Sequence, residues 1–171
     1  MFLNVIMMDD EKFNINKFNI IENEKLFELP SNDMNTNEKK IEKYFRNAKE
    51  DERNFDKVVD LVCKSLQDYP FDLRTMRFLC FLYYQKGDKE MGEKASHRFI
   101  SIIGAILSSG DGESCETAYH VISPRHEFSI LKIFQFESAA QMRVDGCNYL
   151  ELKENKRGME GIYFKVPGIE K

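Results

Sequence analysis

The sequence predicts an α+β fold in which helical hairpins, about four helices in all, pack against a small C-terminal antiparallel β-sheet. Three observations lead to this prediction. Apolar residues recur at helical spacing in four successive stretches between residues 37 and 107. A run of turn-forming residues, Ser108–Ser114, then interrupts the helical pattern. Beyond it, short stretches with strand-like alternation are separated by turn dipeptides.

The first helix is expected over 37–50, because Asn35 can cap its free amides and Glu38 follows three residues later. A second helix is expected over 55–68, and Pro70 cannot continue it. Both helices carry one apolar stripe. The stripe residues are Ile41, Tyr44, Phe45 and Ala48 in the first helix and Val58, Val59, Val62 and Leu66 in the second.

Asp72 caps a third helix, which Gly87 and Asp88 end, and a fourth helix is expected over about 88–107. The third helix has two apolar stripes, so we expect it to lie between neighbours. The stripe residues are Met76, Leu79 and Tyr83 together with Phe78 and Leu82 in the third helix, and Met91, Ala95, Phe99, Ile102 and Ile106 in the fourth.

The stretch Asp72–Asp88 resembles the tetratricopeptide repeat. Leu79, Tyr83 and Gly87 take the positions of that motif's Leu, Tyr and Gly, and Gly92 is the small residue expected where the two helices cross. Helices one and two fit the motif poorly. Since a stack of such repeats needs about three of them to be stable, we expect the C-terminal third to cover the exposed face of this one.

The C-terminal part is expected to form the sheet. Pro124 suits the first turn of a short helix with Phe128, Leu131 and Phe134 on its apolar face. Tyr149, Glu151 and Lys153 should face away from Leu150 and Leu152 because side chains alternate along a strand. The expected strands are 118–123, 136–144, 149–153 and 161–166, with hairpin turns at Asp145–Gly146 and Asn155–Gly158.

The length of the chain limits the number of domains, and its charge limits the expected partners. A chain of 171 residues is near the usual size of one domain. We predict an N-terminal arm over 1–36 and a single domain over 37–171, divided into helical hairpins (37–107) and a sheet with a short helix (108–171). With 25 basic and 29 acidic side chains the net charge is −4, so nucleic acid is not an expected partner.

Four sequence blocks resemble an uncharacterised bacterial family, the domain-of-unknown-function family number 4919. The resemblance extends over about 70–166, and the SSGDG and TAYHVIS stretches are its most specific part. It supports the fold and implies no activity. The blocks are Gly87–Glu90, Ala105–Gly112, Glu116–Ile122 and Gly158–Phe164.

The turn that follows the fourth helix is the candidate catalytic site. Asp111, Glu116 and His120 lie on or just after it, which suggests a hydrolase with its site at the Ser109–Gly112 turn. The nucleophile-elbow, phosphate-loop and calcium-loop patterns are all absent. We therefore favour a structural turn in which Asp and Ser side chains bond the local backbone.

Four basic residues form the candidate partner-binding site. Arg74 and Arg77 are one turn apart on the third helix, and Lys94 and Arg98 are one turn apart on the fourth. In an antiparallel hairpin the two pairs can line one side and bind a carboxylate-bearing peptide or an acidic protein, although we favour a solvated face whose charges pair within their own helices. Five aromatic residues lie outside the apolar stripes and could fill either a contact within the chain or a partner's pocket, namely Phe13, Phe18, Tyr69, Phe71 and Tyr84.

The four cysteines, at 63, 80, 115 and 147, include no CxxC pair. We interpret them as reduced small apolar residues, which indicates a cytoplasmic protein. The apolar opening Met1–Met8 is too short for a signal peptide core or a membrane span. No cofactor or metal is expected, because His120, His126 and Glu127 are not spaced as metal ligands.

Taken together, these patterns favour a non-catalytic protein-interaction module, such as an adaptor, a chaperone or a toxin-immunity protein of a bacterial secretion or competition system. Two alternatives remain open at this point. One is the hydrolase described above, and the other is a structural homo-oligomer subunit whose N-terminal arm swaps onto a second copy.

Overall fold

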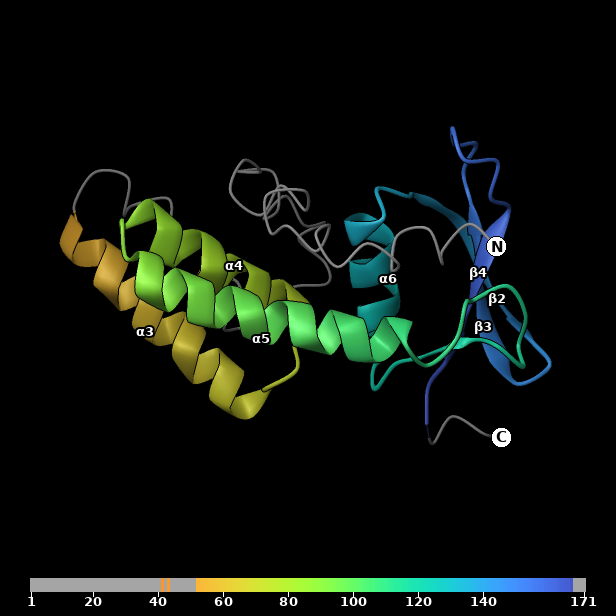
Figure 1. Cartoon of the computed structure of the whole chain (residues 1–171), viewed down its shortest axis with the longest axis horizontal. Helices are drawn as coiled ribbons and strands as arrows, with labels where there is room; N and C mark the ends of the chain where they lie inside the picture. Colours follow the sequence, from red (N-terminus) through yellow and green to blue (C-terminus); the bar gives the residue numbers. More distant parts are fainter. Residues whose placement is uncertain (1–40, 42, 44–51, 168–171) are drawn as a thin grey trace. The chain divides into compact units, whose positions relative to one another are not determined.

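The computed structural model describes residues 41, 43 and 52–167, and Figure 1 shows the arrangement of its helices and strands. The predicted N-terminal arm, 1–36, lies outside the described residues. Of the first predicted helix, only Ile41 and Lys43 are described, and both are helical. The α+β class is confirmed. The elements are α3 (Glu52–Asp68), α4 (Leu73–Gln85), α5 (Lys89–Leu107), β1 (Tyr119–His120), α6 (Pro124–Ile133), β2 (Ser138–Val144), β3 (Cys147–Leu152) and β4 (Gly161–Lys165).

The chain divides into two compact units whose boundary falls after Phe99, inside α5. We call the described residues before this boundary, 41, 43 and 52–99, the helical unit, and those after it, 100–167, the sheet unit. Each unit has its own buried apolar residues.

In the helical unit, α3 and α4 are neighbours, and α4 is buried on two sides as its double stripe predicts. Asp72 caps α4: its carboxylate accepts hydrogen bonds from the Arg74 backbone N–H at 3.3 Å and from the Thr75 hydroxyl at 2.6 Å. Gly87, with φ of +79°, ends this helix in the left-handed region. A Cβ on Gly92 of α5 would lie 3.1 Å from the Tyr84 ring, so the small residue accommodates that aromatic side chain.

The sheet unit contains a four-stranded sheet in the order β1-β4-β3-β2. β2, β3 and β4 are antiparallel as predicted, but β1 pairs parallel to β4, with Tyr119 opposite Phe164. The sheet is therefore mixed. The chain forms α6, β2 and β3 after β1, and only then does β4 pair with β1. The predicted strand 118–123 is also too long, since β1 contains two residues.

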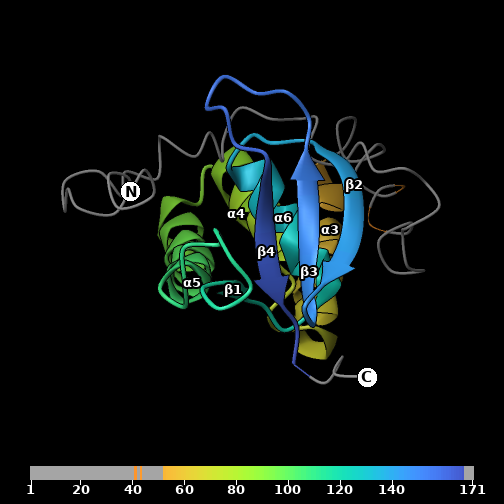
Figure 2. The ribbon, with the colours of Figure 1, turned by 90° about the vertical axis from the view of Figure 1, so that its right-hand side faces the viewer.

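The buried core of the sheet unit lies on one face of the sheet. Figure 2 shows α6 behind the strands, and Leu150, Ile162 and Phe164 are almost completely buried. The predicted alternation along β3 is confirmed, because Leu150 and Leu152 are buried whereas Glu151 is exposed. On the opposite face, the Tyr149 and Tyr163 rings pack with their centroids 4.7 Å apart.

The predicted apolar face of α6 needs correction. Phe128 is 42% exposed, whereas His126 and Glu127 are buried beside Leu131. Helical spacing alone favoured the phenylalanine as a core residue. Instead, the Glu127 carboxyl group of this helix accepts hydrogen bonds from polar side chains of β2 and β3.

Candidate functional site

The Ser109–Thr117 turn folds back on itself. The backbone N–H groups of Asp111 and Gly112 both donate to the Thr117 carbonyl, at 2.9 and 2.8 Å. The Ser109 hydroxyl donates to the Ile106 carbonyl at 2.6 Å and accepts from the His120 backbone N–H at 2.8 Å. The turn therefore satisfies its own polar groups while it joins α5 to β1.

The Asp111 carboxylate is part of this internal bonding. Its Oδ1 accepts from the Glu113 backbone N–H at 2.9 Å. A hydrogen bond from the Thr117 side chain, followed by the one from Glu113, lowers the pKa of Asp111 below its usual value. Ionised Asp111 is thus an acceptor that shapes the turn, as the structural interpretation of this segment predicts.

The other two candidate catalytic residues, Glu116 and His120, are exposed. The described part of the chain shows no hydrogen bond or ion pair among the side chains of Asp111, Glu116 and His120. A general base and the group that orients it have to be within hydrogen-bond reach of each other. The structure therefore does not bring these three side chains together as a hydrogen-bonded set.

The two glycines of the turn have different functions. Gly112 has φ of +74°, and a Cβ there would lie 2.7 Å from the Tyr119 ring and 2.9 Å from Ile162. Gly110 is not among the glycines with positive φ. At Gly110 a side chain is excluded because the carbonyl groups of Thr117 and Ala118 approach too closely.

The interpretation of all four cysteines as reduced is wrong for two of them. Cys115, in the turn, and Cys147, at the start of β3, form a disulfide between residues 32 positions apart. Such bonds are typical of oxidising compartments. Since the predicted cytoplasmic location rested partly on reduced cysteines, the disulfide removes that support. Cys63 and Cys80 are free thiols.

A buried carboxyl group is the main feature that the sequence analysis missed. Glu127 has no exposed surface, and its two oxygens accept hydrogen bonds from Gln141 at 2.9 Å and from Asn148 at 2.7 Å. Burial raises the pKa of Glu127 above its usual value, and the two amide hydrogen bonds oppose that shift. The carboxyl group thereby links α6 to both β2 and β3.

The four basic residues of the candidate partner site all have interactions within the chain. Lys94 pairs with Glu90 at 2.6 Å, and the Arg98 guanidinium donates to the Pro70 carbonyl at 3.1 Å. Arg74 and Arg77 are partly buried and engaged with other groups, and burial lowers the pKa of Arg77. The predicted cationic surface consequently has its charge partly satisfied before any partner binds.

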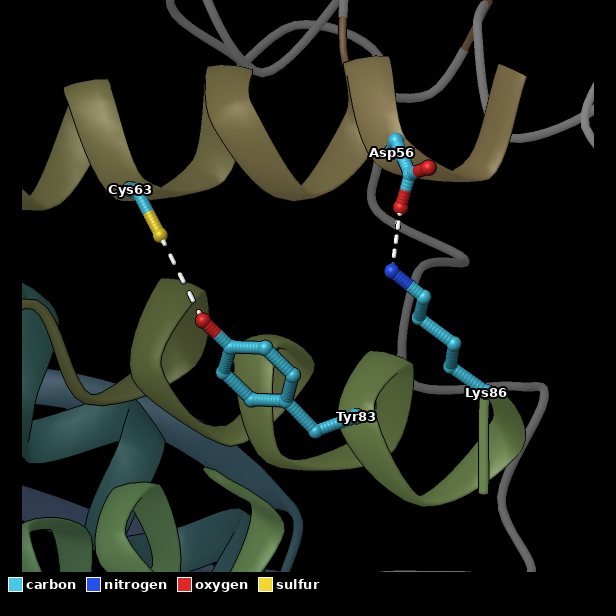
Figure 3. A network of polar contacts seen from close by, with 4 residues as sticks. All are labelled: Asp56, Cys63, Tyr83 and Lys86. Atoms are coloured by element: carbon cyan, nitrogen blue, oxygen red, sulfur yellow. Dashed lines mark hydrogen bonds and ion pairs between the residues drawn. The ribbon is translucent and has the colours of Figure 1, made fainter. Parts of the chain in front are cut away.

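Polar contacts also connect α3 with α4 (Figure 3). The Cys63 Sγ lies 3.9 Å from the Tyr83 hydroxyl, and Lys86 forms an ion pair with Asp56. Burial, followed by the neighbouring Cys63, raises the pKa of Tyr83 to about 12. A phenol with this pKa stays protonated near neutral pH, which fits a contact made in helix packing.

Within residues 41, 43 and 52–167, no group of three or more His, Cys, Asp or Glu side chains is placed to hold a metal ion. None of the helices in the same part of the chain combines the length and the apolar character that crossing a membrane requires.

The described residues belong to the α+β class, and their polar loop is closed by its own hydrogen bonds and by a disulfide. The chain matches the family model described as Domain of unknown function (DUF4919) over residues 27–171, which is most of its length, and it belongs to this family. The match is longer than the resemblance of the individual sequence blocks suggested. No curated protein and no solved structure matches the chain.

Proposed function

We propose that this protein is a non-catalytic protein-interaction module that binds its partner through the connection between α3 and α4. The observation that carries the proposal is the exposure of two aromatic side chains on either side of Pro70. Tyr69 is 59% exposed and Phe71 is 49% exposed. Aromatic residues and arginine are enriched at protein interfaces, and the Arg98 guanidinium lies at the same connection.

Hydrogen bonds hold this connection in one conformation. The Tyr69 backbone N–H donates to the Ser65 carbonyl at 2.9 Å, and the Asp72 N–H donates to the Tyr69 carbonyl at 3.1 Å. The Arg98 guanidinium adds the third contact, to Pro70 at 3.1 Å. Because this backbone is already ordered, binding a partner here costs less conformational entropy than ordering a flexible loop would, which favours a docking function.

Photo-crosslinking in cells of the source organism tests the proposal. Phe71 is replaced with a photoreactive phenylalanine analogue, and the matched control places the same analogue at Phe128, which is 42% exposed on α6. We expect a discrete crosslinked protein from position 71 and none from position 128. Equal patterns from the two positions, no discrete product, or a product with twice the mass of this chain would contradict the proposal.

A double variant, Tyr69→Ser with Phe71→Ser, supplies the second measurement. Because both side chains are exposed, we expect its free energy of unfolding to stay within about 0.5 kcal/mol of the wild type. Copurification of the crosslinked partner should be lost. Retention of the partner by a folded double variant would show that the aromatic pair does not carry the interaction.

A further inference from the structure

The Cys115–Cys147 pair connects two segments of the sheet unit that are 32 positions apart in the sequence. Cys115 lies in the Ser109–Thr117 turn, and Cys147 follows the β2–β3 hairpin turn at Asp145–Gly146. Their Cα atoms are 5.6 Å apart, a separation that a disulfide spans without movement of the backbone. We propose that this pair is a reversible dithiol–disulfide couple that clasps the turn to the hairpin, and that the same fold accommodates both redox states.

The positions of the two sulfur atoms support a folded reduced state. Cys115 Sγ lies 3.3 Å from the Asp145 carbonyl oxygen, and Cys147 Sγ lies 3.4 Å from the Cys115 carbonyl oxygen. After reduction each thiol therefore has a backbone acceptor within hydrogen-bond distance. Because Cys147 is almost completely buried, such an acceptor avoids leaving its S–H unsatisfied.

Both clasped segments also have anchors that do not depend on the disulfide. The Gly112 carbonyl accepts from the Tyr163 backbone N–H of β4 at 2.9 Å. In the hairpin, Asp145 and Gly146 have φ of 52° and 87°, and the flanking residues Val144 and Cys147 are paired. Two consecutive residues with positive φ are typical of a tight hairpin turn whose twist suits the strands. Reduction should accordingly loosen the clasp and leave the sheet in place.

The two cysteines differ in exposure, which gives the exchange a direction. Cys115 is half-buried, whereas Cys147 is 1% exposed. A thiolate of an external dithiol reductant attacks Cys115 Sγ and forms a mixed disulfide, while Cys147 leaves as a thiolate and takes up a proton. The second thiol of the reductant then displaces Cys115, so that one dithiol is oxidised for each protein disulfide reduced.

Stepwise thiol exchange followed by peptide mapping tests the couple. The whole protein is equilibrated in glutathione buffers of graded potential, and free thiols are alkylated and located by mass spectrometry. We expect Cys115 and Cys147 to titrate together and reversibly, with hydrogen exchange of the reduced form increased only near residues 113–117 and 144–147. Two thiols that stay reduced in oxidised glutathione, or global loss of protection on reduction, would overturn the proposal.

The single variants test the direction of exchange. In Cys147→Ser the half-buried Cys115 should form a mixed disulfide with glutathione, and in Cys115→Ser the buried Cys147 should react at least tenfold more slowly. Cys80, which is buried and has its pKa raised to about 11 by that burial, provides an internal reference for an inert thiol. Equal rates at Cys115 and Cys147 in two folded variants would contradict the assigned order of attack.

Discussion

In the helical unit, apolar side chains such as Val58, Val62 and Leu82 are completely enclosed, and ion pairs such as Lys86 with Asp56 lie at the surface. The sheet unit also buries apolar side chains, but it adds a buried carboxyl group and a disulfide. Apolar burial is nearly independent of pH and redox conditions. The contribution of a buried carboxyl group depends on pH, and the contribution of a disulfide depends on redox conditions. The two units should therefore respond differently to the same change of solvent.

Removal of core volume from the helical unit should have the largest effect. Leu82 has no exposed surface in α4, and Leu82→Ala should lower the free energy of unfolding by about 2–5 kcal/mol through lost burial and a cavity. Urea denaturation at pH 5 and pH 7 checks this value. Because no ionisable group is removed, the loss should be the same at both pH values.

The matched control for Leu82→Ala is Phe71→Ala, which deletes a larger side chain that is 49% exposed. It should cost no more than about 0.5 kcal/mol, since little buried contact is lost. A loss at Phe71 as large as the loss at Leu82 would show that core burial does not dominate the stability of the helical unit.

Glu127 should give the sheet unit a pH response that Leu82 does not give the helical unit. Its pKa is raised in the folded state from the ordinary value of 4.5, chiefly by burial. The stabilising contribution of Glu127 to the free energy of unfolding is therefore fully present below pH 4.5. It is lost as the pH rises through the folded pKa. A separation of one pH unit between the folded and unfolded pKa values corresponds to about 1.4 kcal/mol.

The variant Glu127→Gln isolates this contribution because it removes the ionisable group and keeps the shape of the side chain. We expect the stability of the wild type relative to the variant to increase as the pH is lowered from 7 to 4.5, measured by urea denaturation at matched ionic strength. Other titrating groups cancel in the difference. A difference that is constant over this range would show that Glu127 titrates normally in the folded protein.

Local signals predicted most of the fold but only part of the site. The cap at Asp72, the break at Pro70 and the turn at Asp145–Gly146 each depend on a few neighbouring residues, and the structure confirms all three. The Cys115–Cys147 disulfide joins residues 32 positions apart, and spacing alone cannot select that pair.

The burial of Glu127 was not predicted, for a related reason. A carboxyl group on an amphipathic helix is usually a surface residue. Its partners, Gln141 and Asn148, come from two later strands, so their approach depends on the sheet. The parallel pairing of β1 with β4 is likewise a consequence of topology, because no local pattern distinguishes it from an antiparallel pair.

Asp111 should give the smallest effect and the opposite pH dependence. Hydrogen bonds from Thr117 and Glu113 lower its pKa below the ordinary 3.8, so its contribution is present above pH 3.8 and is lost as the pH falls through the folded pKa. Since the group is partly exposed, Asp111→Ala should cost no more than about 1 kcal/mol at pH 7. Asp111→Asn should cost less, because its amide oxygen still accepts from the Glu113 N–H. Urea denaturation at pH 7 and pH 3 compares the three proteins, and a larger loss for Asn than for Ala would show that the turn does not need an acceptor at this position.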